Sequence, residues 1–229
     1  MNALNQNTSE SWDPTWEKIF REEEWGKYPP EHIIRFVARR FYHAKDRQEI
    51  RILDLGCGPG ACSWYIAREG FALSAIDGSE TAIQRCKERL KKESLSGELK
   101  VGDLGKLDWP DNHFDAVIDN AAIYANPFIA CKKIVKEVIR VLKPNGHFSS
   151  TSFTDKTWGN GQGISGNGKN EYLQVIDGPL QNRGFVLFFD YTQIKEILSP
   201  FKQISLDRKT LTVSNGTHSI EWWIAECVK

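Results

Sequence analysis

Residues 50–60 read IRILDLGCGPG, an apolar run that leads directly into three glycines at alternating positions. The run is rich in β-forming residues and has no helical period, which predicts a buried parallel strand over 50–55. At Gly58 and Gly60 a Cβ would obstruct a ligand that lies against the backbone. The helix predicted over 61–69 would offer unpaired N–H groups to the same ligand. The stretch therefore predicts a strand, a ligand-binding turn and a helix, in that order.

The acid that ends the following apolar run completes this unit. Asp77 stands at the end of the strand predicted over 71–77. A carboxylate roughly 20 residues past the glycines can accept hydrogen bonds from both hydroxyls of a ribose. We therefore expect a cofactor that carries a nucleoside. The spacing Gly56-x-Gly58-x-x-Ala61 also satisfies the dinucleotide fingerprint, so an NAD(P)-dependent oxidoreductase is an alternative.

Two further acids argue against a dinucleotide. Asp54 comes just before the first glycine, where a carboxylate would suit an ammonium group and would repel a pyrophosphate. Asp103 ends the third apolar run, where it could accept a hydrogen bond from an adenine amino group. The chain also closes with two strand-like segments, where a dehydrogenase normally adds a substrate domain.

These features resemble those of the class I S-adenosylmethionine (AdoMet)-dependent methyltransferases, closely over about residues 50–153 and loosely beyond. The matching motifs, in the family's order, are LDLGCGPG (53–60), AIDGSE (75–80), VGDLGKL (101–107), FDAVIDN (114–120) and EVIRVLKPNGHF (137–148). The resemblance implies a Rossmann-like α/β fold. In that fold a doubly wound, mostly parallel seven-stranded sheet has helices on both faces and a C-terminal antiparallel hairpin. It also implies AdoMet as the cofactor.

The same resemblance implies a set of cofactor-binding residues along the strand ends. They are Asp54, Gly56, Cys57, Gly58, Gly60, Asp77, Gly78, Ser79, Asp103, Leu104 and Asn120. Trp25 and Tyr28 are expected to cover the methionine end, because aromatic faces suit a sulfonium cation. A binding protein that keeps this pocket but has no acceptor chemistry is a further alternative.

The acceptor site is expected near the ends of the fourth and fifth strands. The residues best placed to line it are Tyr124, Asn126, Phe153 and Trp158. No catalytic base or nucleophile can be assigned, and methyl transfer needs mainly in-line alignment and exclusion of water. The fourth strand ends in DNAA, which matches neither the motif of enzymes that methylate nucleobase amino groups nor a Pro-Cys nucleophile.

Composition limits the chemical class of the methyl acceptor and the cellular compartment that we predict. Thirty basic and thirty acidic residues cancel, which gives no general attraction for nucleic acid or an anionic membrane. We therefore predict O- or N-methylation of a small molecule, by a monomer or homodimer. The five cysteines show no metal-ligand spacing, so no metal is predicted. No signal peptide and no apolar run near ~20 residues is present, so we predict a cytoplasmic protein without a membrane segment.

The chain is predicted to form one methyltransferase domain over 1–229. Residues 1–11 are polar and predicted to be disordered, and 12–48 form an N-terminal helical cap. Residues 154–190 are an insertion, in which 154–168 carry five glycines and are predicted to be a mobile lid over the acceptor. The remaining predicted strands are 99–103, 114–119, 146–153, 203–213 and 219–228, and the remaining helices are 79–92, 127–142 and 191–198.

Overall fold

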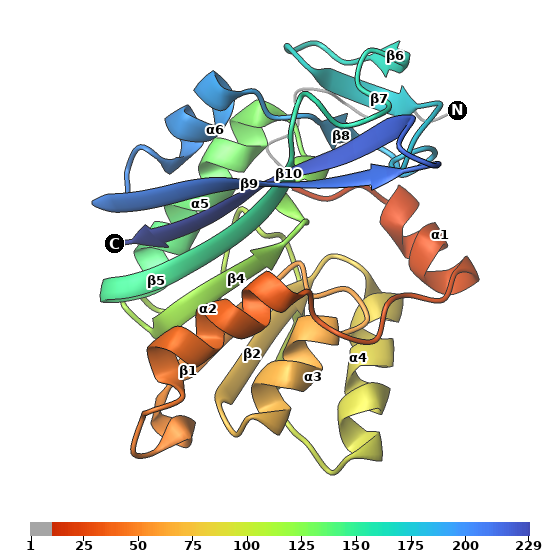
Figure 1. Cartoon of the computed structure of the whole chain (residues 1–229). Helices are drawn as coiled ribbons and strands as arrows, with labels where there is room; N and C mark the ends of the chain where they lie inside the picture. Colours follow the sequence, from red (N-terminus) through yellow and green to blue (C-terminus); the bar gives the residue numbers. More distant parts are fainter. Residues whose placement is uncertain (1–10) are drawn as a thin grey trace.

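A computed structural model describes residues 11–229. Its seven-stranded sheet has the order β3-β2-β1-β4-β5-β10-β9 (Figure 1). The strands β1 to β5 are parallel, and β10 runs antiparallel to both β5 and β9. This confirms the predicted mostly parallel sheet with a C-terminal antiparallel hairpin. The bounds are β1 Arg51–Leu55, β2 Ala72–Asp77, β3 Glu98–Val101, β4 Phe114–Asn120, β5 Leu142–Phe153, β9 Gln203–Val213 and β10 His218–Val228.

Side chains alternate between two buried clusters, one on each face of this sheet. In β1, Ile52 packs into the cluster beneath α2, α3 and α4, whereas Leu53 packs into the cluster beneath α5 and α6. The helices of the first face are α2 (Glu31–Phe41), α3 (Ala61–Arg68) and α4 (Glu80–Lys92). Those of the second face are α5 (Phe128–Val141) and α6 (Tyr191–Leu198).

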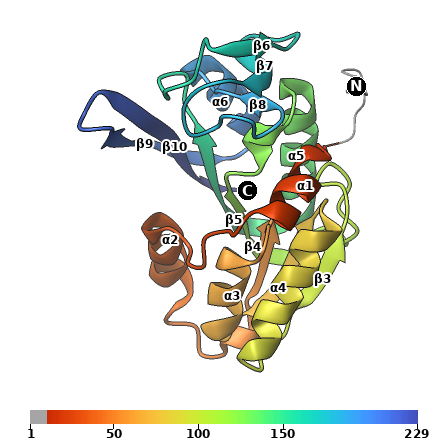
Figure 2. The ribbon, with the colours of Figure 1, turned by 90° about the vertical axis from the view of Figure 1, so that its right-hand side faces the viewer.

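The N-terminal cap contributes α2 and a short helix, α1 (Thr15–Glu22). Figure 2 shows α1 lying above α4 and below β8, at the end of the sheet. The predicted disorder of residues 1–11 falls outside the described residues except at Ser11, which is buried and hydrogen-bonded. No helix within residues 11–229 is long and apolar enough to cross a membrane.

The insertion is more regular than its glycine content predicts. Residues 154–168 are mostly turns and bends, but Gly163–Ser165 form a strand, β6. It joins β7 (Glu171–Val175) and β8 (Val186–Leu187) in a separate three-stranded sheet of order β6-β7-β8 (Figure 1). The lid role stays a prediction. Gly163 shows why glycine occurs here. A Cβ on it would lie 2.0 Å from the carbonyl oxygen of Gln174 on the paired strand. This glycine therefore permits close strand pairing, a role that composition alone does not distinguish from chain mobility.

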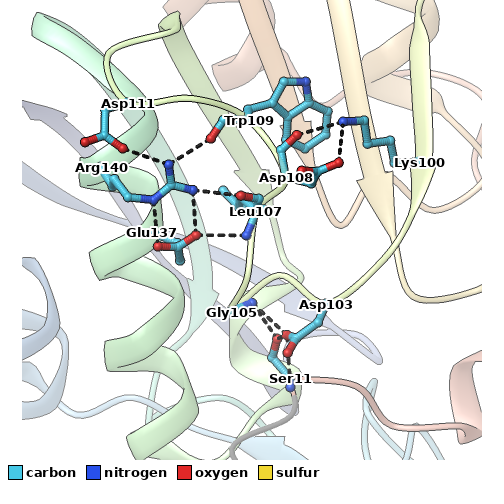
Figure 3. A network of polar contacts seen from close by, with 10 residues as sticks. All are labelled: Ser11, Lys100, Asp103, Gly105, Leu107, Asp108, Trp109, Asp111, Glu137 and Arg140. Carbon is cyan, nitrogen blue, oxygen red and sulfur yellow. Dashed lines mark hydrogen bonds and ion pairs between the residues drawn. The ribbon is translucent and has the colours of Figure 1, made fainter.

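The connection between β3 and β4 is fixed to α5 by one arginine. The guanidinium of Arg140 donates to the carboxylates of Glu137 at 2.9 and 2.8 Å and of Asp111 at 2.9 Å. It also donates to the main-chain oxygens of Leu107 at 2.7 Å and Trp109 at 2.8 Å (Figure 3). Arg140 thus replaces the hydrogen bonds that this irregular segment cannot make with a neighbouring strand.

We expect Arg140→Met to lower the free energy of unfolding by about 2 kcal/mol, because two main-chain carbonyls lose their donor. Denaturant unfolding of the two proteins measures this difference. The matched control is Arg68→Met, since Arg68 pairs with Glu93 at the surface, where side-chain exposures are 56% and 42%. The control should cost less than ~1 kcal/mol. Equal losses for both variants would contradict the structural role of Arg140.

Candidate functional site

A cavity of about 330 Å³ opens where the parallel strands end. Its walls come from the segments that follow β1, β2 and β4, from the end of β5, from the N-terminal segment and from the insertion. Open α/β sheets bind ligands at this edge. Most of the predicted site residues line the cavity, namely Trp25, Asp54, Gly56, Cys57, Gly58, Asp77, Gly78, Leu104, Asn120, Tyr124, Asn126 and Phe153.

The glycines of the turn after β1 have different tasks. Gly58 has a φ of 50° and lines the cavity, and the nearest atom to a Cβ placed on it is 3.4 Å away, in the ring of Phe20. A ligand can therefore lie against the bare backbone there. Gly60, by contrast, does not line the cavity, although the sequence predicted it. A Cβ on Gly60 would lie 2.4 Å from the sulfur of Cys86, so this glycine lets α4 approach the start of α3.

Asp77 ties the glycine turn to the end of β2. Its Oδ2 accepts a hydrogen bond from the Gly58 N–H at 2.8 Å, and its Oδ1 accepts one from the Ser79 N–H at 2.9 Å. Each oxygen keeps a lone pair that could accept a hydroxyl of a ribose. Burial raises the pKa of Asp77 to about 6. The side chain is therefore held in one orientation by two amides and is ready to accept a diol.

A second carboxylate lies beside the first. Asp54 is buried, and its Oδ2 accepts a hydrogen bond from the Ser63 hydroxyl at 2.6 Å. Burial raises the pKa of Asp54 to about 7, and the nearby charges of Asp77 and Asp119 add to this rise. Three buried carboxyl groups close together, those of Asp54, Asp77 and Asp119, favour a ligand that carries positive charge. The ammonium and sulfonium groups of AdoMet meet that requirement.

The N-terminal segment was expected to cover the site through Trp25, but the contribution of Ser11 and Trp12 to the cavity wall was not predicted. The Ser11 N–H donates to Asp103 Oδ1 at 3.2 Å, and its hydroxyl bonds the same oxygen. Trp12 packs on Gly78, where an added Cβ would fall 2.0 Å from the indole ring. Asp103 itself does not line the cavity, whereas Ser11 and Trp12 do. The signal available in the sequence was the pair of tryptophans at 12 and 16, which gave no indication of a contact with Asp103.

Ser79 is another predicted cofactor residue that lies outside the cavity. Its hydroxyl accepts from the Ala82 N–H at 3.0 Å and so begins α4, and it also donates to the Glu17 carboxylate at 2.5 Å. The main-chain N–H of Ser79 donates the hydrogen bond that Asp77 Oδ1 accepts. Ser79 therefore supports the site through Asp77 and through the attachment of α1.

Two aromatic residues that were predicted to contact a ligand, Tyr28 and Trp158, do not line the cavity. Tyr28 is 72% exposed and packs edge-on against Trp64, with ring centroids 5.6 Å apart. Trp158 stacks on His218 with centroids 4.1 Å apart, and its Nε1 donates to Asp177 at 2.8 Å. The insertion reaches the cavity farther along the chain, through Pro179, Leu180 and Arg183.

One part of the cavity wall is largely aromatic, and it begins at the glycine turn, where the Phe20 ring lies 3.4 Å from a Cβ placed on Gly58. Trp25 packs edge-to-face on both Trp16 and Phe20, at centroid distances of 5.8 and 5.4 Å, and Trp16 and Phe20 contact each other in a tilted arrangement at 5.5 Å. Tyr124 and Phe153 pack edge-on at 4.8 Å on the other wall. We call these five aromatic residues and Leu180 the aromatic chamber. Such a lining excludes water and suits an apolar ligand.

Fold and cavity together define a protein that binds AdoMet at the ends of a seven-stranded Rossmann-like sheet. A family model described as a methyltransferase domain matches residues 46–177. The chain therefore belongs to the class I AdoMet-dependent methyltransferase family, and AdoMet is its cofactor.

Relatives and solved structures agree with this assignment. The chain is 34% identical over 143 residues to a sterol 24-C-methyltransferase of Gibberella zeae, a match that covers 56% of this chain and 36% of that protein. An AdoMet-dependent methyltransferase of Methanosarcina mazei has a TM-score of 0.68 at 21% identity, over 88% of this chain and 98% of its own. A 1,6-didemethyltoxoflavin-N1-methyltransferase of Burkholderia thailandensis, solved with S-adenosylhomocysteine, has a TM-score of 0.60 at 14% identity, over 87% and 77%. The last two likenesses are likenesses of fold.

We expect AdoMet to bind more tightly as pH rises from 5 to 8. The pKa values of Asp77 and Asp54, about 6 and 7, are raised above those of unfolded carboxyls, so these acids stabilise the empty fold at low pH and lose that effect as pH rises through 6 to 7. A cationic ligand favours their charged forms, so binding should release protons and gain about tenfold in affinity. Calorimetry in buffers of different ionisation enthalpy measures both the number of protons released and the affinity. An affinity that does not vary with pH would contradict the expectation.

Asp77→Asn should weaken AdoMet binding by about 1.5–3 kcal/mol and reduce the change in affinity between pH 5 and 8.

We expect Ser11→Ala and Asp103→Ala to weaken AdoMet binding to the same modest extent, about threefold to tenfold, because the two side chains act as one anchor for the cavity wall. The double variant should be no weaker than either single variant. Calorimetric titration of all three provides the test. A much larger loss in Asp103→Ala than in Ser11→Ala would show that Asp103 contacts the adenine directly.

Proposed function

We propose that this protein transfers the methyl group of AdoMet to a small and mainly apolar molecule. One observation carries the proposal: a single cavity joins the glycine turn and Asp77 to the aromatic chamber. Donor and acceptor can then lie in one water-poor space, as in-line displacement at carbon requires. AdoMet, when bound, supplies a methyl group activated by its sulfonium.

The residues of this chain would bind and orient the donor. Asp77 would accept the ribose hydroxyls, and the bare backbone at Gly58 would lie under the ligand. Asp54 and Asn120 line the cavity where the family places the methionine ammonium. Trp25 would cover the methionine end with an aromatic face.

The atom that receives the methyl group is proposed to be carbon, in place of the oxygen or nitrogen expected from the sequence. Among the described residues that line the cavity there is no histidine, lysine or glutamate, and two of its three aspartates, Asp54 and Asp77, are assigned to the donor. The third, Asp13, already accepts main-chain hydrogen bonds from Thr15 and Phe185. The relatives named for sterol 24-C-methylation support carbon, although this chain spans about a third of the length of the first of them. The aromatic walls would also stabilise positive charge that develops on an alkene, before the methylated cation loses a proton to solvent and becomes neutral.

The alternatives weighed from the sequence have less support. A dinucleotide would bring its pyrophosphate close to the Asp54 carboxylate, which is buried and has no cation bonded to it among the described residues. A binding protein without turnover would have no need for a water-poor chamber next to the donor site. The family match agrees with both arguments.

We expect incubation with AdoMet and a mixture of apolar metabolites to yield a product heavier by one methylene, detected by mass spectrometry. Carbon-13 in the donor methyl then distinguishes carbon, oxygen and nitrogen acceptors by chemical shift. Asp77→Asn should lower the yield through weaker donor binding, and saturating AdoMet should restore most of it. Tight AdoMet binding without any methylated product from chemically diverse mixtures would favour the binding-protein alternative.

A further inference from the structure

Arg183 is the one cationic side chain among the described residues that line the cavity. Its Nη1 donates to Glu23 Oε2 at 2.7 Å, and its guanidinium lies 5.6 Å from the ring centroid of Trp25. Neither its Nε nor its Nη2 has an acceptor within residues 11–229. A guanidinium carries five N–H donors, so most of them are available to a ligand.

We propose that Arg183 determines acceptor specificity by binding an anionic oxygen, such as a carboxylate or an enolate, on an otherwise apolar acceptor. This inference rests on the proposed function and specifies its substrate class. A planar guanidinium binds two oxygens of a carboxylate side by side, which fixes the orientation of the molecule as well as its affinity. Orientation is what a displacement reaction needs from the acceptor site.

The surroundings of Arg183 hold it in the wall of the cavity. The N–H of Phe185 donates to the buried Asp13 carboxylate at 2.8 Å, and the Arg183 N–H donates to the Leu180 oxygen at 3.3 Å. Asp13 and Glu23, which lie on either side of α1, connect this segment to the region of α1, and the Leu180 bond closes a turn within the insertion. Arg183 is therefore a positioned group, and its side chain is only 25% exposed.

The neighbouring polar groups fit the same ligand. Tyr124 is buried in the cavity wall, and its hydroxyl has no hydrogen-bond partner in the described chain. Burial raises the pKa of this phenol, and the charge of Arg183 opposes part of the rise, so Tyr124 stays protonated as a donor. An oxygen acceptor on the ligand would then meet donors from both Tyr124 and Arg183.

Charge is distributed unevenly along the cavity, which gives the acceptor a direction. Asp54 and Asp77 lie beside the glycine turn, whereas Arg183 belongs to the insertion and lies beside Trp25 of the aromatic chamber. The third acid of the lining, Asp13, accepts the N–H groups of Thr15 and Phe185 with its two oxygens. Asp54 and Asp77 would attract the cationic donor and repel an acidic acceptor, and Arg183 would hold the anionic group of that acceptor away from those two acids. The apolar part is then directed toward the donor.

Two probes of equal shape and different charge provide the test: 2-naphthoate and 2-naphthamide, titrated calorimetrically into protein saturated with S-adenosylhomocysteine. The acid should bind about tenfold more tightly than the amide, a difference of about 1.4 kcal/mol. Arg183→Gln should remove this preference, and Arg183→Lys should retain part of it. Equal affinities in the natural protein, no binding of the acid at millimolar concentration, or a preference that survives in Arg183→Gln would overturn the proposal.

Two further variants separate this role from a structural one. Arg68 also pairs with a glutamate and lies over a tryptophan, 5.2 Å from the ring centroid of Trp64, but outside the cavity. Arg68→Gln should leave the preference for the acid unchanged. Glu23→Gln removes the partner that partly neutralises Arg183, and it should strengthen binding of the acid several-fold.

The affinity for S-adenosylhomocysteine distinguishes failure of the proposed function from failure of the role proposed for Arg183. If the natural protein binds neither AdoMet nor its demethylated product, the proposed function fails. If S-adenosylhomocysteine binds equally to the natural protein and to Arg183→Gln while no charge preference is found, only the role of Arg183 fails. Thermal unfolding of each variant verifies that folding is intact.

Discussion

The two hydrogen bonds that Asp77 accepts from main-chain amides are the contact on which the site depends. They connect the turn after β1, the end of β2 and the start of α4 through one buried carboxylate. The N–H groups of Gly56 and Cys57 strengthen the same junction, since both donate to the oxygen of Ile76 at 2.8 and 3.0 Å. Three elements thus meet with fixed geometry, and the cavity opens beside their junction. At this junction backbone groups define much of the cavity surface, whereas aromatic side chains form much of the remaining wall.

Local sequence patterns allowed the parallel sheet and the glycine turn beside the cavity to be predicted. The glycine turn, Asp77 and the alternation of strands and helices all depend on residues close together in the sequence, where periodicity and turn chemistry apply. The C-terminal hairpin was found for the same reason, since Asn215-Gly216 marks its turn. Residues within the cofactor motifs therefore lie mainly where they were expected. The exceptions are Gly60, Ser79 and Asp103. Gly60 and Ser79 belong to the same junction but serve its packing and capping, and Asp103 bonds to Ser11.

The N-terminal cover and the remaining walls of the cavity were predicted less well because contacts between distant residues build them. Ser11 and Asp103 are 92 residues apart, and no sequence pattern relates them. Tyr28 and Trp158 are aromatic residues of the kind that often line binding sites. Each packs instead against a ring outside the cavity, that of Trp64 and that of His218. Arg183 was overlooked because a single arginine in a glycine-containing turn has no periodic signal. An apolar pattern indicates that a side chain will be covered but does not identify what covers it.

The bond between Asp13 and Phe185 has a consequence for how such an enzyme can change over evolution. It joins a segment before α1 to a segment of the insertion that lies 172 residues away. An insertion acquired from another family member would leave the buried Asp13 carboxylate without its distant amide, at a cost of about 1–3 kcal/mol. The two segments must therefore be exchanged together. In a chimera they form one recombination unit together with the start of α4, because Glu17 on α1 accepts hydrogen bonds from the hydroxyls of Ser79 and Thr81.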